Sequence, residues 1–363
     1  MLKIKRYNKN PILSPNPDVP WMSELTMNPG VVFDGDRFRM LFTAGANDGF
    51  FRLGYAESNN GFDFKIRTDT PFLEPSKNSE DYDFGTIDDP RITYLDGKYY
   101  IVHAARSLNM HDYASGNYRV GPNGKRFPTW RNNYRRLGVS VTTDWKTVKR
   151  LGPVSSEHLC DANGVLFPEK VNNKYVWLHR PTSATPWLLP MRYNPGCMWI
   201  LFSDEVDHWS SDRREMPWDM VDGVDIPDDY LLISPEKAWE EFKVGALGVP
   251  IITDDGFLVF YHGVDRVGTY RIGLLLLDRN DPRRVLCRTP EPIMVPETKM
   301  ELLGTYPGCI FPSANVVVGD EIFLYYGAGD HYCCLANLSL KAALEHVKKY
   351  TGNRTEINSS SYK

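Results

Sequence analysis

The segment FDGDRFRMLFTAG at 33–45 joins a tight polar turn to an aromatic-rich run, and four later segments repeat this pattern. They are YLDGKYYIVHAAR at 94–106, VNNKYVWLHRP at 171–181, TDDGFLVFYHGVD at 253–265 and VVGDEIFLYYGAGD at 317–330. A turn of Gly, Asn or Asp between apolar runs is typical of a β-hairpin. Helical periodicity is almost absent elsewhere, so the sequence predicts an all-β chain.

A second apolar run follows each of these hairpin signals. The five runs are RLGYAES at 52–58, RRLGVSV at 135–141, CMWILFS at 197–203, RIGLLLL at 271–277 and CCLANLS at 333–339. The turn residues Gly35, Gly97, Asn173, Gly256 and Gly319 are 62, 76, 83 and 63 residues apart (97−35, 173−97, 256−173, 319−256). Each interval has room for about four strands, which predicts a five-bladed β-propeller. A pair of β-sandwiches is the alternative.

The length of the chain allows two domains or one large repetitive domain. The chain has 363 residues, is 42% hydrophobic and carries a net charge of −4, so disorder is excluded and no nucleic-acid or membrane partner is indicated. No signal peptide or membrane span is evident, and a cytoplasmic location is expected. We expect a single catalytic domain over 1–363, with a short C-terminal helix over 339–349 and a polar tail over 351–363. A homo-oligomer is left open.

Neither cysteine nor histidine spacing indicates a metal site. The six cysteines are scattered without a CxxC pair and are expected to be buried free thiols. His179 and His262 lack a third ligand at a metal-binding spacing, so they are expected to form hydrogen bonds in a pocket. No metal or other cofactor is therefore expected.

In a propeller, the ends of the inner strands surround one axis. The repeats carry mostly ionisable side chains at these ends: Thr43, the stretch 103–106, His179 with Arg180, Tyr261 with His262, and Asp330. This pattern predicts a polar pocket on the axis.

Adjacent carboxylates stand in the sequence Asp88-Asp89-Pro90-Arg91. Neighbouring carboxylates beside an arginine have their pKa values pushed apart, as acid and base catalysis requires. The alternative is a turn that Asp caps and Pro fixes.

Two further segments are candidates for the same pocket. In AWEEFKVGALGVP at 238–250, Glu240 and Glu241 stand beside Lys243, where they would bind a polar substrate and activate water; a solvated charged loop is the alternative. The stretch 107–136 is rich in Tyr, Trp, Arg and Asn and is expected to line an acceptor subsite or to act as a lid. A subunit contact is the alternative there.

Eight segments together resemble glycoside hydrolase family 130. They are NPIL at 10, MNPGVVF at 27, DDPRIT at 88, NGVLFPEKVNNKYVWLHRP at 163, FKVGA at 242, DDGFLVFYHGV at 254, RIGLLLLDRNDPRRVLCR at 271 and YYGAGD at 325, in the family's order. The family contains β-mannosidases and β-mannoside phosphorylases on a five-bladed propeller, so the resemblance implies action on β-mannoside oligosaccharides.

The resemblance also implies residue roles. Asp89 matches the proton donor to the leaving oxygen, relayed in phosphorylases through a mannose hydroxyl. Asn28 and Asp330 match positions that hold the sugar, and Arg180, Lys243 and His262 match the phosphate-binding group. Arg91, Asn163 and Tyr261 are further candidates for substrate binding.

The sequence departs from the family at two places. Ala162 stands where the phosphorylases normally have a basic residue, and Thr43 where the family often has arginine. Losing one charge-assisted hydrogen bond would weaken phosphate binding about tenfold to a hundredfold. The departure at Ala162 therefore favours hydrolysis over phosphorolysis.

Three functions follow, in order of preference. The first is an inverting β-mannosidase with Asp89 as acid and Glu240 or Glu241 as base, with Asp161 or Glu157 as less favoured bases. The alternative is a β-mannoside phosphorylase that releases mannose 1-phosphate and needs inorganic phosphate as co-substrate but no base. The third is a propeller that binds glycans without catalysis.

Overall fold

The computed structural model describes residues 2–79, 81–115, 135–154, 159–183, 196–207 and 229–351, without the side chains of 159, 160, 182, 183 and 229. Strands dominate this part of the chain, and nearly all pair antiparallel. The expected all-β class is therefore confirmed. Within these ranges, no helix has the length and apolar character to cross a membrane.

The N-terminal half of the described chain forms one large sheet of two antiparallel meanders. The first contains β2 (Leu25–Phe33), β3 (Phe38–Gly45), β4 (Phe51–Ser58) and β5 (Lys65–Ile66), and the second β6 (Thr86–Leu95), β7 (Lys98–Arg106), β8 (Arg136–Thr142) and β9 (Lys149–Pro153). A parallel pairing of Phe51 with Thr86 joins β4 to β6.

Three further sheets follow. The third meander contains β10 (Leu159–Leu166), β11 (Tyr175–Ser183), β12 (Met198–Ser203) and β13 (Asp229–Ile233). The fourth contains β14 (Lys243–Ala246), β15 (Ile251–Thr253), β16 (Gly256–Val264), β17 (Tyr270–Leu277) and β18 (Val285–Arg288). The fifth contains β19 (Ile310–Val318), β20 (Glu321–Ala328), β21 (Tyr332–Ser339) and the N-terminal β1 (Lys5–Arg6), which pairs with β21.

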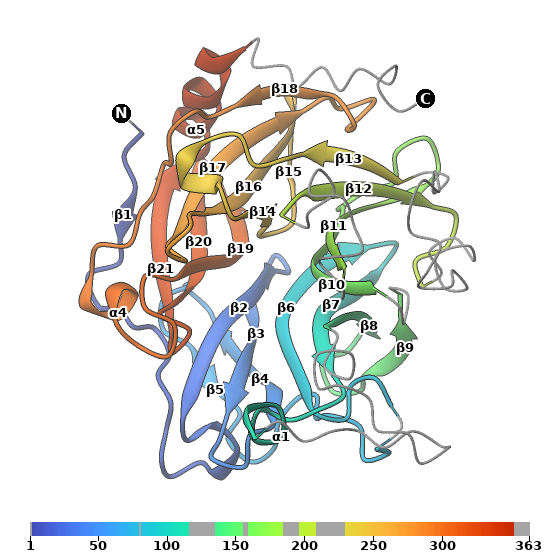
Figure 1. Ribbon diagram of the computed structural model, residues 1–363, viewed down its shortest axis with the longest axis vertical. Helices are drawn as coiled ribbons and strands as arrows, with labels where there is room; N and C mark the ends of the chain where they lie inside the picture. The colour runs from blue at the N-terminus through green and yellow to red at the C-terminus, as the bar shows by residue number, and fades with distance from the viewer. Residues whose placement is uncertain are drawn as a thin grey trace.

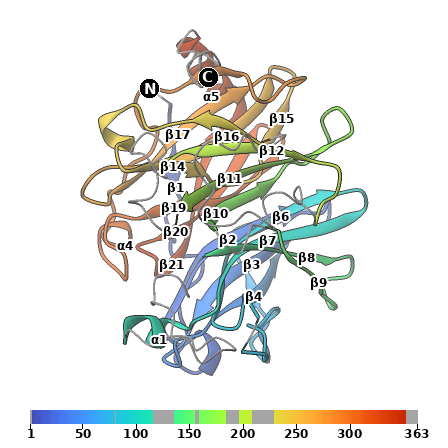
Figure 2. The same ribbon diagram turned by 45° about the vertical axis from the view of Figure 1, so that its right-hand side comes forward.

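The meanders follow one another around a common centre (Figures 1 and 2). Five buried apolar clusters lie between successive meanders. Phe167 and Phe257, for example, join the third and fourth with ring centroids 5.0 Å apart. Phe38 and Phe323, 5.4 Å apart, join the first and the fifth. The core is therefore divided among the contacts between neighbours, and it includes a contact between the first and last meanders.

The five predicted turn residues all have positive φ: Gly35 93°, Gly97 76°, Asn173 63°, Gly256 137° and Gly319 63°. Glycine and asparagine tolerate this region, where other side chains are strained. The turn signals of the sequence are confirmed, because four of these residues lie between two paired strands and Gly256 is the first residue of β16, paired with Thr253 of β15.

The predicted C-terminal helix is present as α5 (Leu340–Val347), followed by a 3₁₀ turn, η4 (Lys348–Tyr350). The Ser339 side chain caps α5 by accepting from the Ala342 N–H at 3.1 Å, and Ala343 and Val347 are buried. Four short helical turns were not predicted: η1 (Pro20–Met22), α1 (Met110–Ala114), η3 (Ala238–Glu240) and α4 (Lys299–Leu302). Most of the 107–136 stretch and the 352–363 tail lie outside the described residues.

Candidate active site

Three inner strands are interrupted by the same irregularity. The pairing register shifts between Met27 and Gly30 in β2, between Asp88 and Arg91 in β6, and between Ala162 and Val165 in β10. The first residue inside each bulge is Asn28, Asp89 or Asn163, buried and with φ of 50°, 56° and 56°. A β-bulge redirects a side chain, and such strained backbone is typical of functional sites. The side chains of Asn28, Asp89 and Asn163 are therefore positioned by the same kind of β-bulge in three strands.

The bulges of β2 and β6 lie in direct contact. A Cβ on Gly30 would lie 2.4 Å from the Pro90 carbonyl oxygen, so glycine is required for this approach. Across it, the Asn28 amide donates to Asp89 Oδ1 at 2.7 Å. Thr43 Oγ1 accepts from the Asp89 N–H at 3.0 Å, so this departure from the family's arginine has a structural role.

Two other carboxyl groups, of buried Asp88 and half-buried Asp330, lie near Asp89. Burial, and next the negative charge of Asp89, raises the pKa of Asp88 to about 6. The same two causes raise the pKa of Asp330 to about 6. The Cys309 thiol donates to Asp330 Oδ1 at 3.5 Å. The site therefore holds carboxyl groups that exchange protons near neutral pH, as acid catalysis requires.

Arg91 supports the backbone of the β6 bulge. Its guanidinium is buried and donates from Nε to the Leu247 carbonyl at 2.7 Å and from Nη1 to the Asp89 carbonyl at 3.0 Å. Burial lowers the pKa of Arg91 to about 10, so it remains charged at neutral pH. Its cation thus lies beside the acid Asp89 without forming a salt bridge to that carboxylate among the described contacts.

A second group of side chains is cationic. Arg180 Nη1 lies 3.0 Å from Nε2 of buried His262. Burial, and next the charge of Arg180, lowers the pKa of His262 well below its usual value, so the ring is neutral at pH 7. Because arginine only donates, Nε2 must be the acceptor and the ring proton must be on Nδ1. His262 therefore offers an N–H donor to a ligand.

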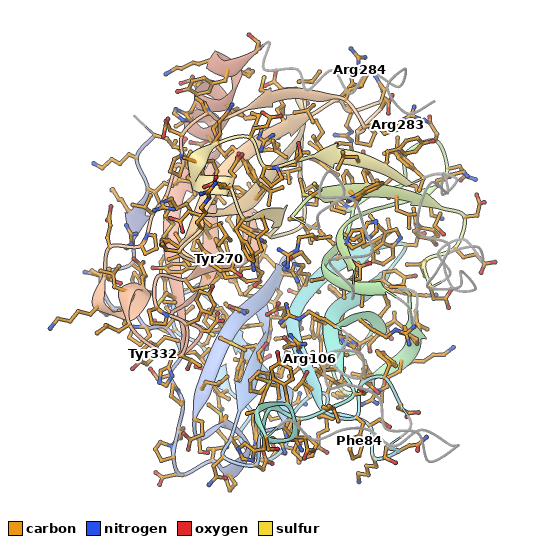
Figure 3. All side chains as sticks on the ribbon, viewed as in Figure 1. Phe84, Arg106, Tyr270, Arg283, Arg284 and Tyr332 are labelled. Atoms are coloured by element: carbon orange, nitrogen blue, oxygen red, sulfur yellow. The ribbon has the colours of Figure 1, made fainter. Side chains whose placement is uncertain are left out.

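Lys243 lies in the same cationic group. Burial, and next the positive charges of Arg180 and Arg135, lowers the pKa of Lys243 to about 7. Its ammonium lies 4.9 Å from the ring centroid of Tyr270, which Figure 3 shows near the middle of the molecule. In the described part of the chain, no carboxylate forms an ion pair with it.

Gly245 explains how β14 reaches this group. A Cβ there would lie 2.7 Å from His262 Cε1 and 3.0 Å from Asn163 Oδ1. The glycine of the sequence Lys243-Val244-Gly245-Ala246 therefore allows the third and fourth meanders to place His262 and Asn163 side by side.

Several buried polar atoms here have no hydrogen-bond partner among the described residues. They are Asn28 Oδ1, Arg91 Nη2, Asn163 Oδ1, His262 Nδ1 and Ser313 Oγ, from five different strands. A buried polar atom without a partner costs about 1–3 kcal/mol, so such a concentration requires an explanation. A ligand rich in hydroxyl groups and anionic oxygens would supply the partners.

Glu240 does not lie free beside Lys243 as expected. Its carboxylate is fully buried and accepts from the Tyr261 hydroxyl at 2.6 Å and from Arg288 Nη2 at 2.6 Å. It also accepts from the N–H groups of Glu236 and Lys237. Both oxygens are occupied, so these contacts give no support to Glu240 as base. Tyr261, expected to bind substrate, has its hydroxyl turned to this carboxylate instead.

The arrangement recurs in the fifth meander, far from the expected base. Glu301 accepts from the Tyr326 hydroxyl at 2.8 Å and from Arg6 Nε at 2.7 Å. Each glutamate is the third residue of a short helical turn and accepts from the backbone that precedes it, in a capping box. We call Glu240–Tyr261–Arg288 and Glu301–Tyr326–Arg6 the outer triads. Their repetition indicates a role in the fold.

The other expected bases that are described also have partners of their own. Glu241 is 41% exposed and pairs with exposed Arg266. Asp161 is bound to Nδ1 of His179 at 2.9 Å, and both are buried. Glu157 lies outside the described residues. Among the described residues, no group of three or more His, Cys, Asp or Glu side chains is arranged to hold a metal ion.

Sequence reasoning singled out neither Arg135, which it considered only as part of the 107–136 stretch, nor Cys309. Arg135 lies just before β8, with Nη2 4.0 Å from Asp88 Oδ2. Cys309 precedes β19 and contacts Asp330. No local motif marks either residue, and the recurrence of Asn28-Pro29 and Asp89-Pro90 does not by itself show a register shift. Of the cysteines whose side chains are described, all are free and Cys197 is only half-buried.

Comparisons with known proteins identify the family of this chain. A family model described as beta-1,4-mannooligosaccharide phosphorylase matches residues 3–349. A 1,2-beta-oligomannan phosphorylase of Thermoanaerobacter sp. (strain X514) is 32% identical over 348 residues, which are 94% of this chain and 99% of the relative. A beta-1,2-mannobiose phosphorylase of the same organism is 30% identical, covering 93% of this chain and 97% of the relative.

The structural comparison agrees on the fold. The beta-1,2-mannobiose phosphorylase of Listeria innocua, solved with beta-1,2-mannobiose, superimposes with a TM-score of 0.75 at 21% identity, covering 96% of this chain and all of that one. The fold and the matches define a carbohydrate-active enzyme. The chain belongs to glycoside hydrolase family 130, as the resemblance implied.

Proposed function

We propose that this protein is a β-mannoside phosphorylase, the second of the functions that the sequence predicts. The observation that carries the proposal is the cationic group of Arg180, Lys243 and neutral His262, with a ring N–H that has no partner among the described residues. Hydrolysis needs no such group, whereas a phosphate dianion needs several charged or N–H donors in a buried site. The phosphorylase names of the relatives support the same function.

In the proposed reaction, a phosphate oxygen attacks the anomeric carbon from the side of Arg180, Lys243 and His262. The bond from that carbon to the leaving sugar oxygen breaks, and this oxygen receives the proton supplied by Asp89. The products are α-mannose 1-phosphate and an oligosaccharide shortened by one mannose. Asn28, Asn163 and Asp330 hold the mannose between acid and anion. Because phosphate is itself the nucleophile, no carboxylate base is required.

The preference for hydrolysis derived from the sequence depended on a free base and on the missing cation at Ala162. Glu240 is held in an outer triad, and Glu241 pairs with Arg266 at the surface. The contacts of neither glutamate favour its acting as a base that activates water. Arg135 brings a further positive charge to the site. These observations support phosphorolysis over the inverting mannosidase.

We also infer that each of the five meanders is one blade of a β-propeller. Five apolar clusters lie between successive meanders, and one of them lies between the last meander and the first. Five units with five such contacts form a ring. A ring brings the bulges of β2, β6 and β10 to one axis, and the contact between Asn28 and Asp89 is consistent with that position.

The test is to incubate the protein with β-1,2- and β-1,4-linked mannobiose and mannotriose, with and without inorganic phosphate, in a phosphate-free buffer. We expect mannose 1-phosphate only when phosphate is present, with the α anomer formed first in NMR spectra. Using both linkages identifies the preferred substrate. Mannose release at the same rate without phosphate would instead identify a mannosidase, and binding without turnover of any mannoside would identify a glycan-binding protein.

A further inference from the structure

Arg135 connects the second and third meanders at the edge of the site. Its carbonyl oxygen accepts from the Asp161 N–H at 2.7 Å, which fixes the backbone of Arg135 beside the start of β10. Its side chain is 28% exposed, and Nη2 lies 4.0 Å from Asp88 Oδ2 in the β6 bulge. The guanidinium is therefore partly exposed to solvent and lies close to the Asp88 carboxyl group.

The residue that follows Asp161 is Ala162, which pairs with Arg180 across β10 and β11. Ala162 is buried and ends in a methyl group, so β10 itself supplies no cation beside Arg180. Arg135 is held next to this position by the bond to Asp161. The cationic side chain of Arg135, from the second meander, is thus held near Ala162, where the third meander provides no cation.

The charge of Arg135 acts on the rest of the site. It contributes to the lowered pKa values of Lys243 and Arg91, after burial and after nearer charges. Four cations, Arg91, Arg135, Arg180 and Lys243, therefore repel one another around the cluster. Like charges gathered in a buried site are stabilised when an anion binds between them.

We propose that Arg135 is an anion-binding residue of this site, supplying from the second meander the cation that β10 lacks at Ala162. The inference rests on the proposed phosphorolysis and adds to it a residue that reaches the phosphate from the side of Asp88. Arginine suits this task, because its planar fork of N–H groups matches the geometry of phosphate oxygens. The ion pair with Asp88 orients the fork.

The experiment compares Arg135→Ala, Arg135→Lys and the double variant Arg135→Ala with Ala162→Arg. Initial rates of phosphorolysis are measured while inorganic phosphate and the mannoside are varied separately. We expect Arg135→Ala to raise KM for phosphate about tenfold to a hundredfold, with KM for the mannoside changed by less than about threefold. The KM for phosphate of Arg135→Lys is expected to lie between those of the wild type and Arg135→Ala. Adding Ala162→Arg to Arg135→Ala is expected to restore much of the phosphate affinity, because it returns a cation to the same place.

Arg136→Ala is the matched control. The Arg136 guanidinium lies over the ring of Tyr82, at 5.7 Å from its centroid, and we expect its loss to leave KM for phosphate unchanged. Thermal shifts produced by inorganic phosphate alone provide a readout that does not depend on turnover. Should Arg135→Ala fail to fold, Arg135→Gln, which is shorter and uncharged but keeps a planar NH2 group with two N–H donors, replaces it in both measurements.

The outcomes separate this inference from the proposed function. A wild-type enzyme that needs no phosphate would overturn the phosphorylase and the inference together. A phosphate-dependent wild type in which Arg135→Ala keeps both KM for phosphate and the phosphate-induced thermal shift would overturn the role of Arg135 alone. A rise in KM for the mannoside of the same size as that for phosphate would also overturn it, since this would indicate a general disturbance of the site.

Discussion

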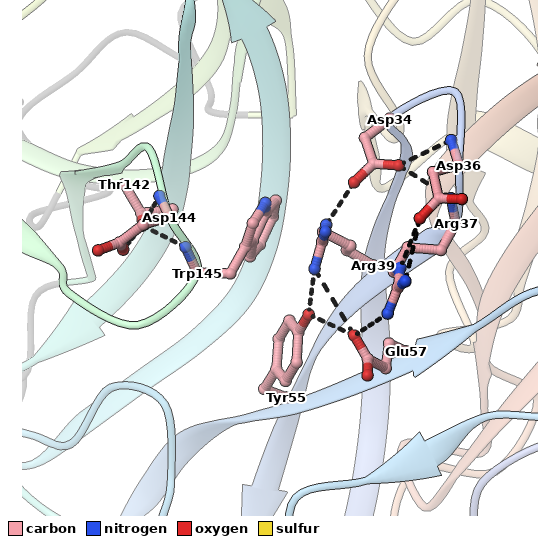
Figure 4. Close-up of polar contacts among 9 residues, drawn as sticks. All are labelled: Asp34, Asp36, Arg37, Arg39, Tyr55, Glu57, Thr142, Asp144 and Trp145. Carbon is pink, nitrogen blue, oxygen red and sulfur yellow. Dashed lines mark hydrogen bonds and ion pairs between the residues drawn. The ribbon is translucent and has the colours of Figure 1, made fainter.

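The outer triads and the candidate active site both contain buried charged groups. They differ in how completely these charges are paired. In the outer triads, each glutamate accepts from a tyrosine hydroxyl, from an arginine and from backbone N–H groups. A partly exposed version occurs in the first meander, where Arg39 bonds Tyr55 at 2.8 Å and Tyr55 bonds Glu57 at 3.2 Å (Figure 4). Completed pairing of the glutamates indicates a structural role, whereas Arg288 Nη1, 3.4 Å from Glu236 Oε1, makes no hydrogen bond to the described residues.

In the candidate active site, by contrast, the charged and polar groups are incompletely paired. Asp330 bonds a weakly donating thiol, Lys243 contacts aromatic rings, and His262 Nδ1 has no partner among the described residues. The pKa values of Asp88, Asp330 and Lys243 are all displaced against the charged form. Burial of charged groups alone therefore does not identify a functional site. The two regions differ in how completely their charged groups are paired.

The largest effect is expected from Asp89→Asn. This change keeps the shape and the bond to Asn28 but removes the proton donor, so kcat should fall about 10²- to 10⁴-fold. Steady-state rates with a mannoside and phosphate measure the loss, and unchanged mannoside binding by calorimetry shows that the site is intact. A variant that keeps wild-type kcat would mean that another group is the acid.

The next effect concerns stability. Glu240→Gln and Glu301→Gln each remove the less exposed of the two carboxylates that pair with an arginine, leaving Glu236 with Arg288 and Glu297 with Arg6. The loss of unfolding free energy should therefore stay below the roughly 3–5 kcal/mol of a fully broken buried pair. The effect should be larger at Glu240, because Arg288 is 1% exposed and Arg6 is 19% exposed. Urea denaturation measures both losses. If the triads are structural, the folded fraction of each variant should keep kcat within a few-fold of wild type; a stable but inactive Glu240→Gln would return Glu240 to the role of base.

Asp330→Asn should stabilise the free protein in a pH-dependent way. The folded-state pKa of Asp330 is raised from 3.8 to about 6, so the stability of the protein falls as pH rises toward and through about 6. A difference of this size corresponds to at most roughly 3 kcal/mol. We therefore expect Asp330→Asn to gain stability over wild type at a pH of about 8 and little at a pH of about 4. An equal gain at both pH values in thermal melts would show that the titration of Asp330 is not the cause.

The smallest effect is on phosphate binding. The ammonium of Lys243 has its pKa lowered to about 7, so it loses its charge as pH rises above that value. The KM for phosphate should then rise up to about tenfold per pH unit above neutrality. Lys243→Arg keeps the charge at all these pH values and should flatten the rise. The same slope in both enzymes would show that a different group, or phosphate itself, titrates.

The parts of the fold that were predicted correctly depend on local sequence. The residues with positive φ at Gly97 and Asn173, and the helix capped by Ser339, lie within a few residues of the patterns that indicated them. The resemblance named Asp89, Arg180 and His262, and the structure brings Asp89 to Asn28 and Arg180 to His262.

What was missed depends on contacts between distant parts of the chain. Glu240 resembles a free acid beside Lys243 until Arg288, 48 residues later, is placed against it. Arg135 reaches the site only because its backbone is bonded to Asp161 of another meander. The bulges were also missed, because a register shift becomes visible only when the partner strand is known.

The pairing of β1 with β21 has a consequence for synthesis. Residues 5 and 6 are synthesised well before their partners Asn337 and Ala336, which lie in the last of the described strands, and Arg6 bonds Glu301 across 295 residues. Closing so long a loop is entropically slow compared with forming the hairpins. Residues 5 and 6 therefore remain unpaired while the meanders form in order. A tag or fusion attached before residue 5 would interfere with the last step of assembly, the pairing of β1 with β21, rather than with the first.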